Sequence, residues 1–161
     1  TRRVMDGEFD AAILASSGLT RLGMQDRIAS YLPTDVMIPA AGQGAIAIET
    51  RADDEVTNAL CAAISDESTL RCVAAERVRA ERAMNTRLEG GCQVPMGIYA
   101  AEFDRDGATV FGIDAFVSSL DGGRFLRASA EGDPAASTEL ARSVVCDLRD
   151  QGAEEILEEL R

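Results

Sequence analysis

The chain has 161 residues and a formal net charge of −12, with 16 basic residues, 28 acidic residues and no histidine. Every basic residue is arginine, because the sequence contains no lysine. A Ser-His-Asp triad, a Cys-His pair, a histidine-ligated metal and a lysine Schiff base are therefore excluded within this chain. The acidic excess argues against a nucleic-acid partner, since phosphate binding needs a basic face. The length allows one domain or two small ones.

The cysteine pattern and the lack of long apolar runs predict a cytoplasmic protein with free thiols and no metal. No apolar run approaches the roughly 20 residues of a membrane span, and the first residues do not form a signal peptide. The cysteines, Cys61, Cys72, Cys92 and Cys146, have no CxxC spacing. Cys61 and Cys146 lie in apolar helical patterns typical of core residues, and Cys72 also lies in a helical pattern. Only Cys92 lies in a predicted loop.

The first third of the chain has the pattern of an α/β protein. Residues 9–15 form a short apolar run, which predicts a buried strand, and residues 19–24 predict a short helix. Such a strand-turn-helix step places backbone N–H groups at a helix N-terminus, a natural position for a carboxylate or phosphate.

Residues 36–39 and 45–49 predict two further strands, separated by Ala40-Ala41-Gly42-Gln43-Gly44. Glycines on either side of one polar residue suit a chain that crosses between domains with unusual backbone torsions, and they also suit an ordinary tight turn.

Two helices are predicted next, one from Asp53 through Ile64 and one from about Ser65 to Leu88. Within the second helix, Ala75-Glu76-Arg77 recurs as Ala80-Glu81-Arg82. A shift of five residues fits neither the heptad nor the helical period, so we interpret it as a local duplication.

The pattern after residue 95 changes to a period of two. Strands are predicted at residues 97–103, 109–117 and 124–130, with hairpin turns at 104–107 and 121–123. A last helix is predicted from about residue 135 to 160, interrupted at Gly152. Residues from about 68 onward therefore predict a small α+β domain.

The best nucleophile of the chain is Cys92, which follows Gly90-Gly91 after the arginine-rich helix. Two glycines allow close approach to the thiol. Arg82 and Arg87 lie ten and five residues upstream, where they can hold anions or favour the thiolate. The partial negative charge of a helix C-terminus opposes that second effect.

The stretch Arg87-Leu88-Glu89-Gly90-Gly91-Cys92-Gln93-Val94-Pro95 resembles the cofactor-attachment loop of the hydroxymethylbilane synthase family, also called the porphobilinogen deaminase family. Residues 10–15, 18–23 and 39–45 resemble further family motifs in the same order. The resemblance implies that Cys92 forms a thioether to a dipyrromethane cofactor. It also implies a transferase of porphyrin and heme biosynthesis that condenses four porphobilinogen molecules, with loss of ammonia, into hydroxymethylbilane.

The resemblance also implies roles for individual residues. Each pyrrole carries an acetate and a propionate, and a guanidinium fork binds a carboxylate through two contacts. Arg21 and Arg82 are expected to bind these carboxylates, and Ser17, Gly18 and Gly91 complete the expected cofactor-binding residues. The family's catalytic aspartate is expected outside this chain.

The fold implied by the resemblance is α/β plus α+β: the end of a periplasmic-binding-protein-like domain, then a small domain with a three-stranded antiparallel sheet and helices. The expected division is residues 1–43 in the second domain, 44–67 returning into the first, and 68–161 as the third. Family enzymes are about twice this length, so this chain alone is expected to be inactive. The full-length family enzymes are expected to be monomers. Its helix before Cys92 is about six residues longer than in the family.

Two other functions stay open. A non-catalytic module of periplasmic-binding-protein type that binds small carboxylates would use the strand-turn-helix step but would leave the Cys92 loop unexplained. A redox thiol protein is disfavoured because no resolving cysteine lies nearby in the sequence.

Overall fold

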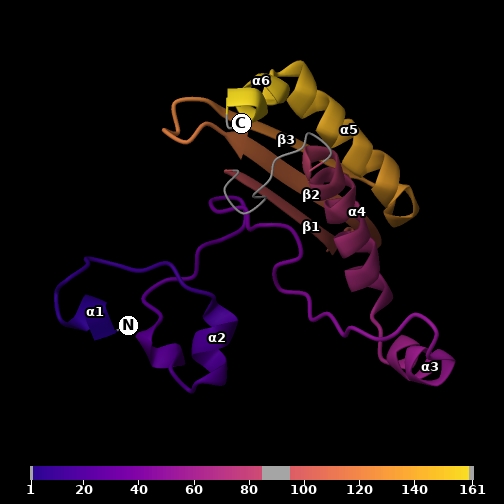
Figure 1. Cartoon of the computed structure of the whole chain (residues 1–161), viewed down its shortest axis with the longest axis horizontal. Helices are drawn as coiled ribbons and strands as arrows, with labels where there is room; N and C mark the ends of the chain where they lie inside the picture. Colours follow the sequence, from indigo (N-terminus) through magenta and orange to yellow (C-terminus); the bar gives the residue numbers. More distant parts are fainter. Residues whose placement is uncertain (1, 85–94, 160–161) are drawn as a thin grey trace. The chain divides into compact units, whose positions relative to one another are not determined.

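The computed structural model describes residues 2–84 and 95–159, without the side chains of residues 77–84. The chain divides into two compact units, Thr1–Met37 and Ile38–Arg161, which we describe separately. In Figure 1 the colours follow the sequence, so each unit can be found from the residue numbers on the colour bar.

The second unit is built on a three-stranded antiparallel sheet in the order β1-β2-β3. The strands are β1 (Met96–Arg105), β2 (Ala108–Ser118) and β3 (Phe125–Gly132), each within two residues of its predicted bounds. Asp106 and Gly107 connect β1 to β2 with φ values of 56° and 82°. Two consecutive positive φ angles are what a tight two-residue hairpin needs, so the predicted sheet and its first turn are confirmed.

Helices α4 (Glu67–Met84) and α5 (Ser137–Asp150) lie over one face of this sheet (Figure 1). Alternate residues of β2 face them and are buried: Phe111, Ile113, Ala115 and Val117. The helices contribute Ala75, Ala141, Val144 and Leu148 to the same core. Burial of this apolar surface is the main stabilising contribution to the second unit.

The predicted last helix is broken where expected. A 3-10 turn (Pro134–Ala136) leads into α5, and Gly152, with φ of 97°, separates α5 from α6 (Ala153–Glu159). Only glycine adopts that torsion readily, so the helix cannot run through this position without strain.

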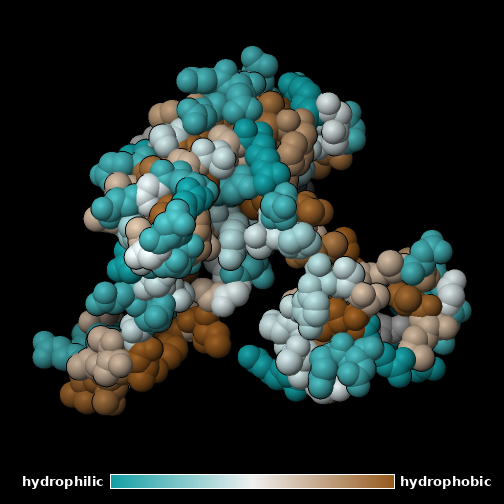
Figure 2. Space-filling view, turned by 180° about the vertical axis from the view of Figure 1, so that it is seen from behind, coloured by the Kyte–Doolittle hydropathy of each residue, from teal (hydrophilic) through white to brown (hydrophobic). Residues whose placement is uncertain are grey.

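Helix α3 (Glu55–Ala63) is confirmed, and Asp54 caps it by accepting a hydrogen bond of 3.0 Å from the Thr57 amide. Its apolar residues Val56, Leu60 and Ile64 are exposed, and Figure 2 shows brown surface at the lower left, where this helix lies. No helix in the described part of the chain is both long and apolar enough to cross a membrane.

The first unit contains α1 (Arg2–Met5), α2 (Ser16–Arg21) and a 3-10 turn (Gln25–Arg27). Helix α2 begins and ends three residues before the predicted helix. It begins early because the Gly18 and Leu19 amides both donate to the Ala15 carbonyl. It ends early because Gly23 takes a φ of 66°, which allows its amide to donate back to the Thr20 carbonyl.

The strands predicted at residues 9–15, 36–39 and 45–49 are not present, so this part of the predicted α/β architecture is not seen. A strand needs a neighbouring strand to pair its backbone amides and carbonyls, and the described residues supply none here. Most apolar side chains of these segments are correspondingly exposed, Ile13 at 68% and Ile46 at 84%, while Ile38 is buried at 8%.

We predict that Gly97→Ala destabilises the second unit by about 1–3 kcal/mol. A Cβ at this position would lie 2.7 Å from the Ile38 carbonyl oxygen and 2.9 Å from the Pro39 carbonyl oxygen, and backbone atoms cannot give way cheaply. Urea unfolding followed by circular dichroism measures the loss. Gly123→Ala is the control, since its Cβ would meet only the Asp121 side chain. Equal stability of the two variants would contradict the prediction.

We also predict an acid-sensitive contribution from Glu102 in β1. Arg71 of α4 donates to both oxygens of this carboxylate, at 2.6 and 3.2 Å, and these hydrogen bonds lower the Glu102 pKa from its ordinary 4.5. The stabilisation is therefore fully present above about pH 4.5 and is lost as pH falls through the lowered pKa of the folded state.

The measurement is the difference in free energy of unfolding between the unsubstituted protein and Glu102→Gln at several pH values. The difference should shrink as the pH falls from about 5 toward about 2, because a paired carboxylate becomes protonated over roughly this range. Glu67→Gln is the control, because this partner of Arg71 is 90% exposed and 3.7 Å away. A pH-independent difference would contradict the prediction.

Candidate functional site

Three of the predicted site residues lie together on helix α2. Ser17, Gly18 and Arg21 are all exposed, and Ser17 and Arg21 are four residues apart, so they share one face of the helix. The Gly18 amide donates to the Ala15 carbonyl at 3.1 Å, so it serves the start of the helix in this structure. Of the predicted strand-turn-helix step, the helix is present and the strand at residues 9–15 is not.

Arg21 differs from most arginines of the described residues in having no carboxylate partner among them. Ion pairs are formed by Arg2, Arg3, Arg51, Arg71, Arg105, Arg124, Arg127, Arg142 and Arg149. Arg27 resembles Arg21 in this respect and donates only to the Met5 sulfur, at 3.3 Å. Sequence reasoning did not single out Arg27, because composition cannot show which arginines form ion pairs. Among the described arginines, these two guanidinium groups are available for a carboxylate from outside the chain.

The other predicted site residues fall wholly or partly outside the described residues. Gly91 and Cys92 lie outside them, as does Arg87. Arg82 lies within α4, whose backbone is described there, while its side chain is not. Helix α4 runs without interruption through both Ala-Glu-Arg triplets, so the duplicated residues are not looped out.

Each of the described cysteines lies in a helix, so none of them has the loop setting that the sequence predicts for Cys92. Burial raises the pKa of the Cys72 thiol, and the neighbouring Glu102 and Glu76 carboxylates raise it further. Cys61 is half-buried. The core position predicted for Cys146 is wrong, because Val144, Val145 and Leu148 form the buried stripe of α5 and position 146 lies beside it.

A cluster that sequence reasoning missed joins helix α4 to the glycine-containing segment at residues 38–44. The Glu76 carboxylate accepts hydrogen bonds from the Gly42 amide at 2.7 Å and from the Ala100 amide of β1 at 2.9 Å. Next to it, the Ile98 amide donates to the Pro39 carbonyl at 2.8 Å. The sequence marked Glu76 only as part of a duplicated triplet, because nothing local shows that its side chain is buried.

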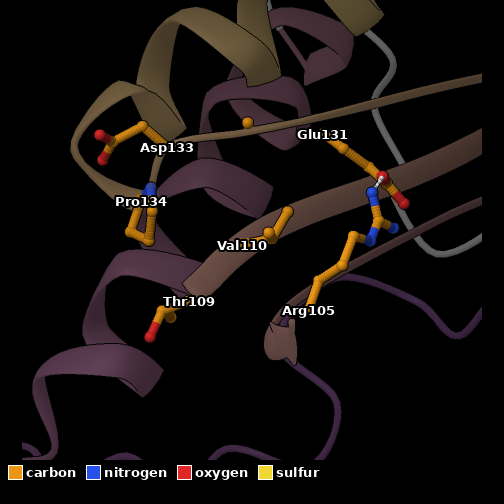
Figure 3. Close-up of a pocket in the computed structure, with 7 residues that line it drawn as sticks. Arg105, Thr109, Val110, Glu131, Asp133 and Pro134 are labelled. Atoms are coloured by element: carbon orange, nitrogen blue, oxygen red, sulfur yellow. Dashed lines mark ion pairs between the residues drawn. The ribbon is translucent and has the colours of Figure 1, made fainter. Parts of the chain in front are cut away.

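A shallow pocket of about 470 Å³ lies beside the β1–β2 turn (Figure 3). It is lined by Arg105, Thr109, Val110, Glu131, Gly132, Asp133 and Pro134. Arg105 and Glu131 neutralise each other through an ion pair of 2.8 Å, drawn as a dashed line in Figure 3. None of the predicted site residues lines this pocket, and we assign it no role.

Comparison with protein families identifies both parts of the chain. Residues 1–59 match the porphobilinogen deaminase dipyromethane cofactor binding domain, and residues 75–150 match the porphobilinogen deaminase C-terminal domain. These are domains of a transferase class that acts in porphyrin biosynthesis. The two matches follow each other along most of the sequence, and the chain belongs to the porphobilinogen deaminase family.

The cofactor of the matched domain is dipyrromethane. The described residues fit such a group at Arg21. Its pyrroles carry carboxylates, and Arg21, within residues 1–59, offers an exposed guanidinium with no carboxylate partner among the described residues. A guanidinium binds a carboxylate through two parallel hydrogen bonds.

We predict that Arg21→Gln weakens the binding of porphobilinogen carboxylates by roughly 10- to 100-fold, the range expected for one charge-assisted contact of about 1.5–3 kcal/mol. Isothermal titration with porphobilinogen measures the change. Arg142→Gln is the matched control, because Arg142 already forms an ion pair with Glu139 at 3.8 Å. An equal loss in both variants would show a general charge effect in place of a specific contact.

Proposed function

We propose that this chain is part of an enzyme that condenses four porphobilinogen molecules into hydroxymethylbilane, on a dipyrromethane primer held by the protein. Four ammonia molecules leave during the additions, and one water molecule releases the linear product. The single observation that carries the proposal is the pair of consecutive family matches, because the Cys92 motif lies inside the second. The substrate that the family implies is porphobilinogen.

Cys92 is the proposed attachment point of the primer, through a thioether. A thiol that serves as a permanent anchor is not regenerated in each cycle, so it needs no partner histidine, and the chain contains none. The residue before it, Gly91, has no side chain that would hinder approach to the sulfur. Dipyrromethane supplies the pyrrole carbon on which the chain is extended, and the protein's residues hold and orient it.

Arg21 and Arg82 are the proposed carboxylate-binding residues, with Ser17 and Gly18 as weaker backbone donors. For Arg21, support comes from its exposure and from the absence of a carboxylate partner among the described residues. For Arg82, support comes only from the sequence resemblance. Arg82 and Arg77 occupy the same place in the two Ala-Glu-Arg triplets of one unbroken helix, so Arg77 is the natural comparison in mutagenesis.

We propose a domain division of residues 1–43, 44–67 and 68–161, with the first two segments belonging to periplasmic-binding-protein-like domains. The exposed apolar residues at 9–15 and 45–49 support this, because such segments become stable strands only beside other strands. The described residues contain no such neighbours, so we propose that the chain alone does not catalyse the reaction.

A second candidate function is a module that binds small carboxylates without chemistry. The exposed guanidinium of Arg21 would serve it equally well. The two functions differ at Cys92, because a binding module has no use for a covalent primer.

The mass of the intact protein separates these functions. We predict that the chain, joined to the N-terminal portion of a porphobilinogen deaminase and incubated with porphobilinogen, gains the mass of a dipyrrole on the peptide that contains Cys92. The gain should be absent in Cys92→Ser, since the thioether needs the sulfur. The 161-residue chain alone should stay unmodified and inactive.

Cys146→Ser is the control, because Cys146 is the exposed cysteine among those described and should carry no adduct. If the joined protein forms hydroxymethylbilane while Cys92 remains unmodified, the anchor role is wrong. If it binds porphobilinogen without turnover or adduct, the binding-module function is favoured.

A further inference from the structure

The Glu76 carboxylate is a charged group in the interior of the second unit, with a residue exposure of only 5%. Both oxygens accept backbone hydrogen bonds, one from Gly42 and one from Ala100. Burial of a carboxylate is costly unless its oxygens are hydrogen-bonded, so these two bonds are needed to keep the side chain in place. The group therefore ties together two segments that are far apart in the sequence.

The strand that Glu76 contacts is an edge strand, because β1 pairs only with β2 in the described sheet. The outward amides of an edge strand need acceptors from elsewhere. The Ile98 amide donates to the Pro39 carbonyl and the Ala100 amide donates to Glu76. Helix α4 and the segment at residues 38–42 together cover this edge.

Two glycines allow the close approach. Gly42, whose amide donates to Glu76, has a φ of 75°, which other residues rarely adopt. Gly97 lies against the carbonyls of Ile38 and Pro39, with no space for a Cβ. The contacts at residues 38–42 therefore depend on a carboxylate and on two positions without side chains.

We propose that Glu76 is a positioning residue for the porphobilinogen deaminase reaction, and that it locks the segment at residues 38–42 to α4 and β1. The first family match includes this segment, and the second match includes Glu76 and Ala100. The carboxylate thus sets how the chain leaving the cofactor-binding region meets the C-terminal domain. The predicted effect of Glu76 on turnover rests on the proposed function, whereas its role in holding residues 38–42 does not.

The second Ala-Glu-Arg triplet does not offer a second residue at the position from which Glu76 bonds the Gly42 and Ala100 amides. Positions 76 and 81 are five residues apart in one unbroken helix, which separates them by a net rotation of about 140° and about 7.5 Å along the axis. Gly42 and Ala100 are both engaged by position 76. Glu81 is therefore a matched comparison in the same sequence context.

The test is amide hydrogen exchange in Glu76→Gln, measured by NMR on the 161-residue chain. A glutamine keeps the shape but offers one acceptor oxygen and an NH₂ group, so one of the two amides loses its acceptor. The Gly42 or Ala100 amide should exchange at least about tenfold faster relative to the core amide of Val144, a change of about 1.4 kcal/mol in local opening. Glu81→Gln should leave these ratios within about twofold.

Unchanged ratios in Glu76→Gln, or equal changes in Glu81→Gln, would overturn the proposal. If Glu76→Gln does not fold, Glu76→Asp replaces it, since the shorter carboxylate keeps the charge but does not span both amides. Failure of both variants to fold would assign Glu76 to the stability of the core and would also overturn the positioning role.

Measurement of kcat and KM distinguishes a positioning role from a purely structural one, because a purely structural role would leave kcat unchanged in the folded protein. In the chain joined to the N-terminal portion of a family enzyme, Glu76→Gln should lower kcat about tenfold and leave KM for porphobilinogen within about twofold, because Glu76 holds the backbone of residues 38–42 and is not among the proposed carboxylate-binding residues. Faster exchange without a change in kcat would show a joint that does not position the chemistry. An inactive unsubstituted protein would instead reject the proposed function, and the exchange result would be unaffected.

Discussion

The open edge of strand β1 is the constraint on which the second unit depends. A three-stranded sheet has two edges, and the amides on the β1 edge must find acceptors that no fourth strand supplies. A carbonyl from residue 39 and a buried carboxylate from α4 serve two of them. This requirement fixes the position of α4 and brings residues 38–42 against the sheet.

The same edge explains why polar groups occur in an otherwise apolar interface. Ala75, next to Glu76, is buried in the core, so α4 turns an apolar surface and a carboxylate toward β1 together. The Arg71–Glu102 pair lies one turn earlier on the helix and closes the interface toward solvent. Apolar burial supplies most of the stability, while the directional bonds decide the register of the helix against the strand.

Charge has a different role on the surface. Most described arginines form exposed ion pairs, which contribute little to stability. They do reduce the number of guanidinium groups open to an external anion. For the carboxylates of a dipyrromethane cofactor, the cations without a partner among the described residues matter more than the total number of arginines. Among the described residues these are Arg21 and Arg27.

The sequence by itself determined the elements whose bonds are local. The hairpins, the break at Gly152, and helices α3 and α4 follow from period, caps and turn residues within a few positions, and the Cys92 motif identified the family. Residues 9–15 and 45–49 have the same apolar character as true strands, yet they are not strands, because their pairing partners would have to come from distant segments. Only the tertiary structure decided that Glu76 is the copy that bonds Gly42 and Ala100, since its burial is set by contacts with residues far away in the sequence.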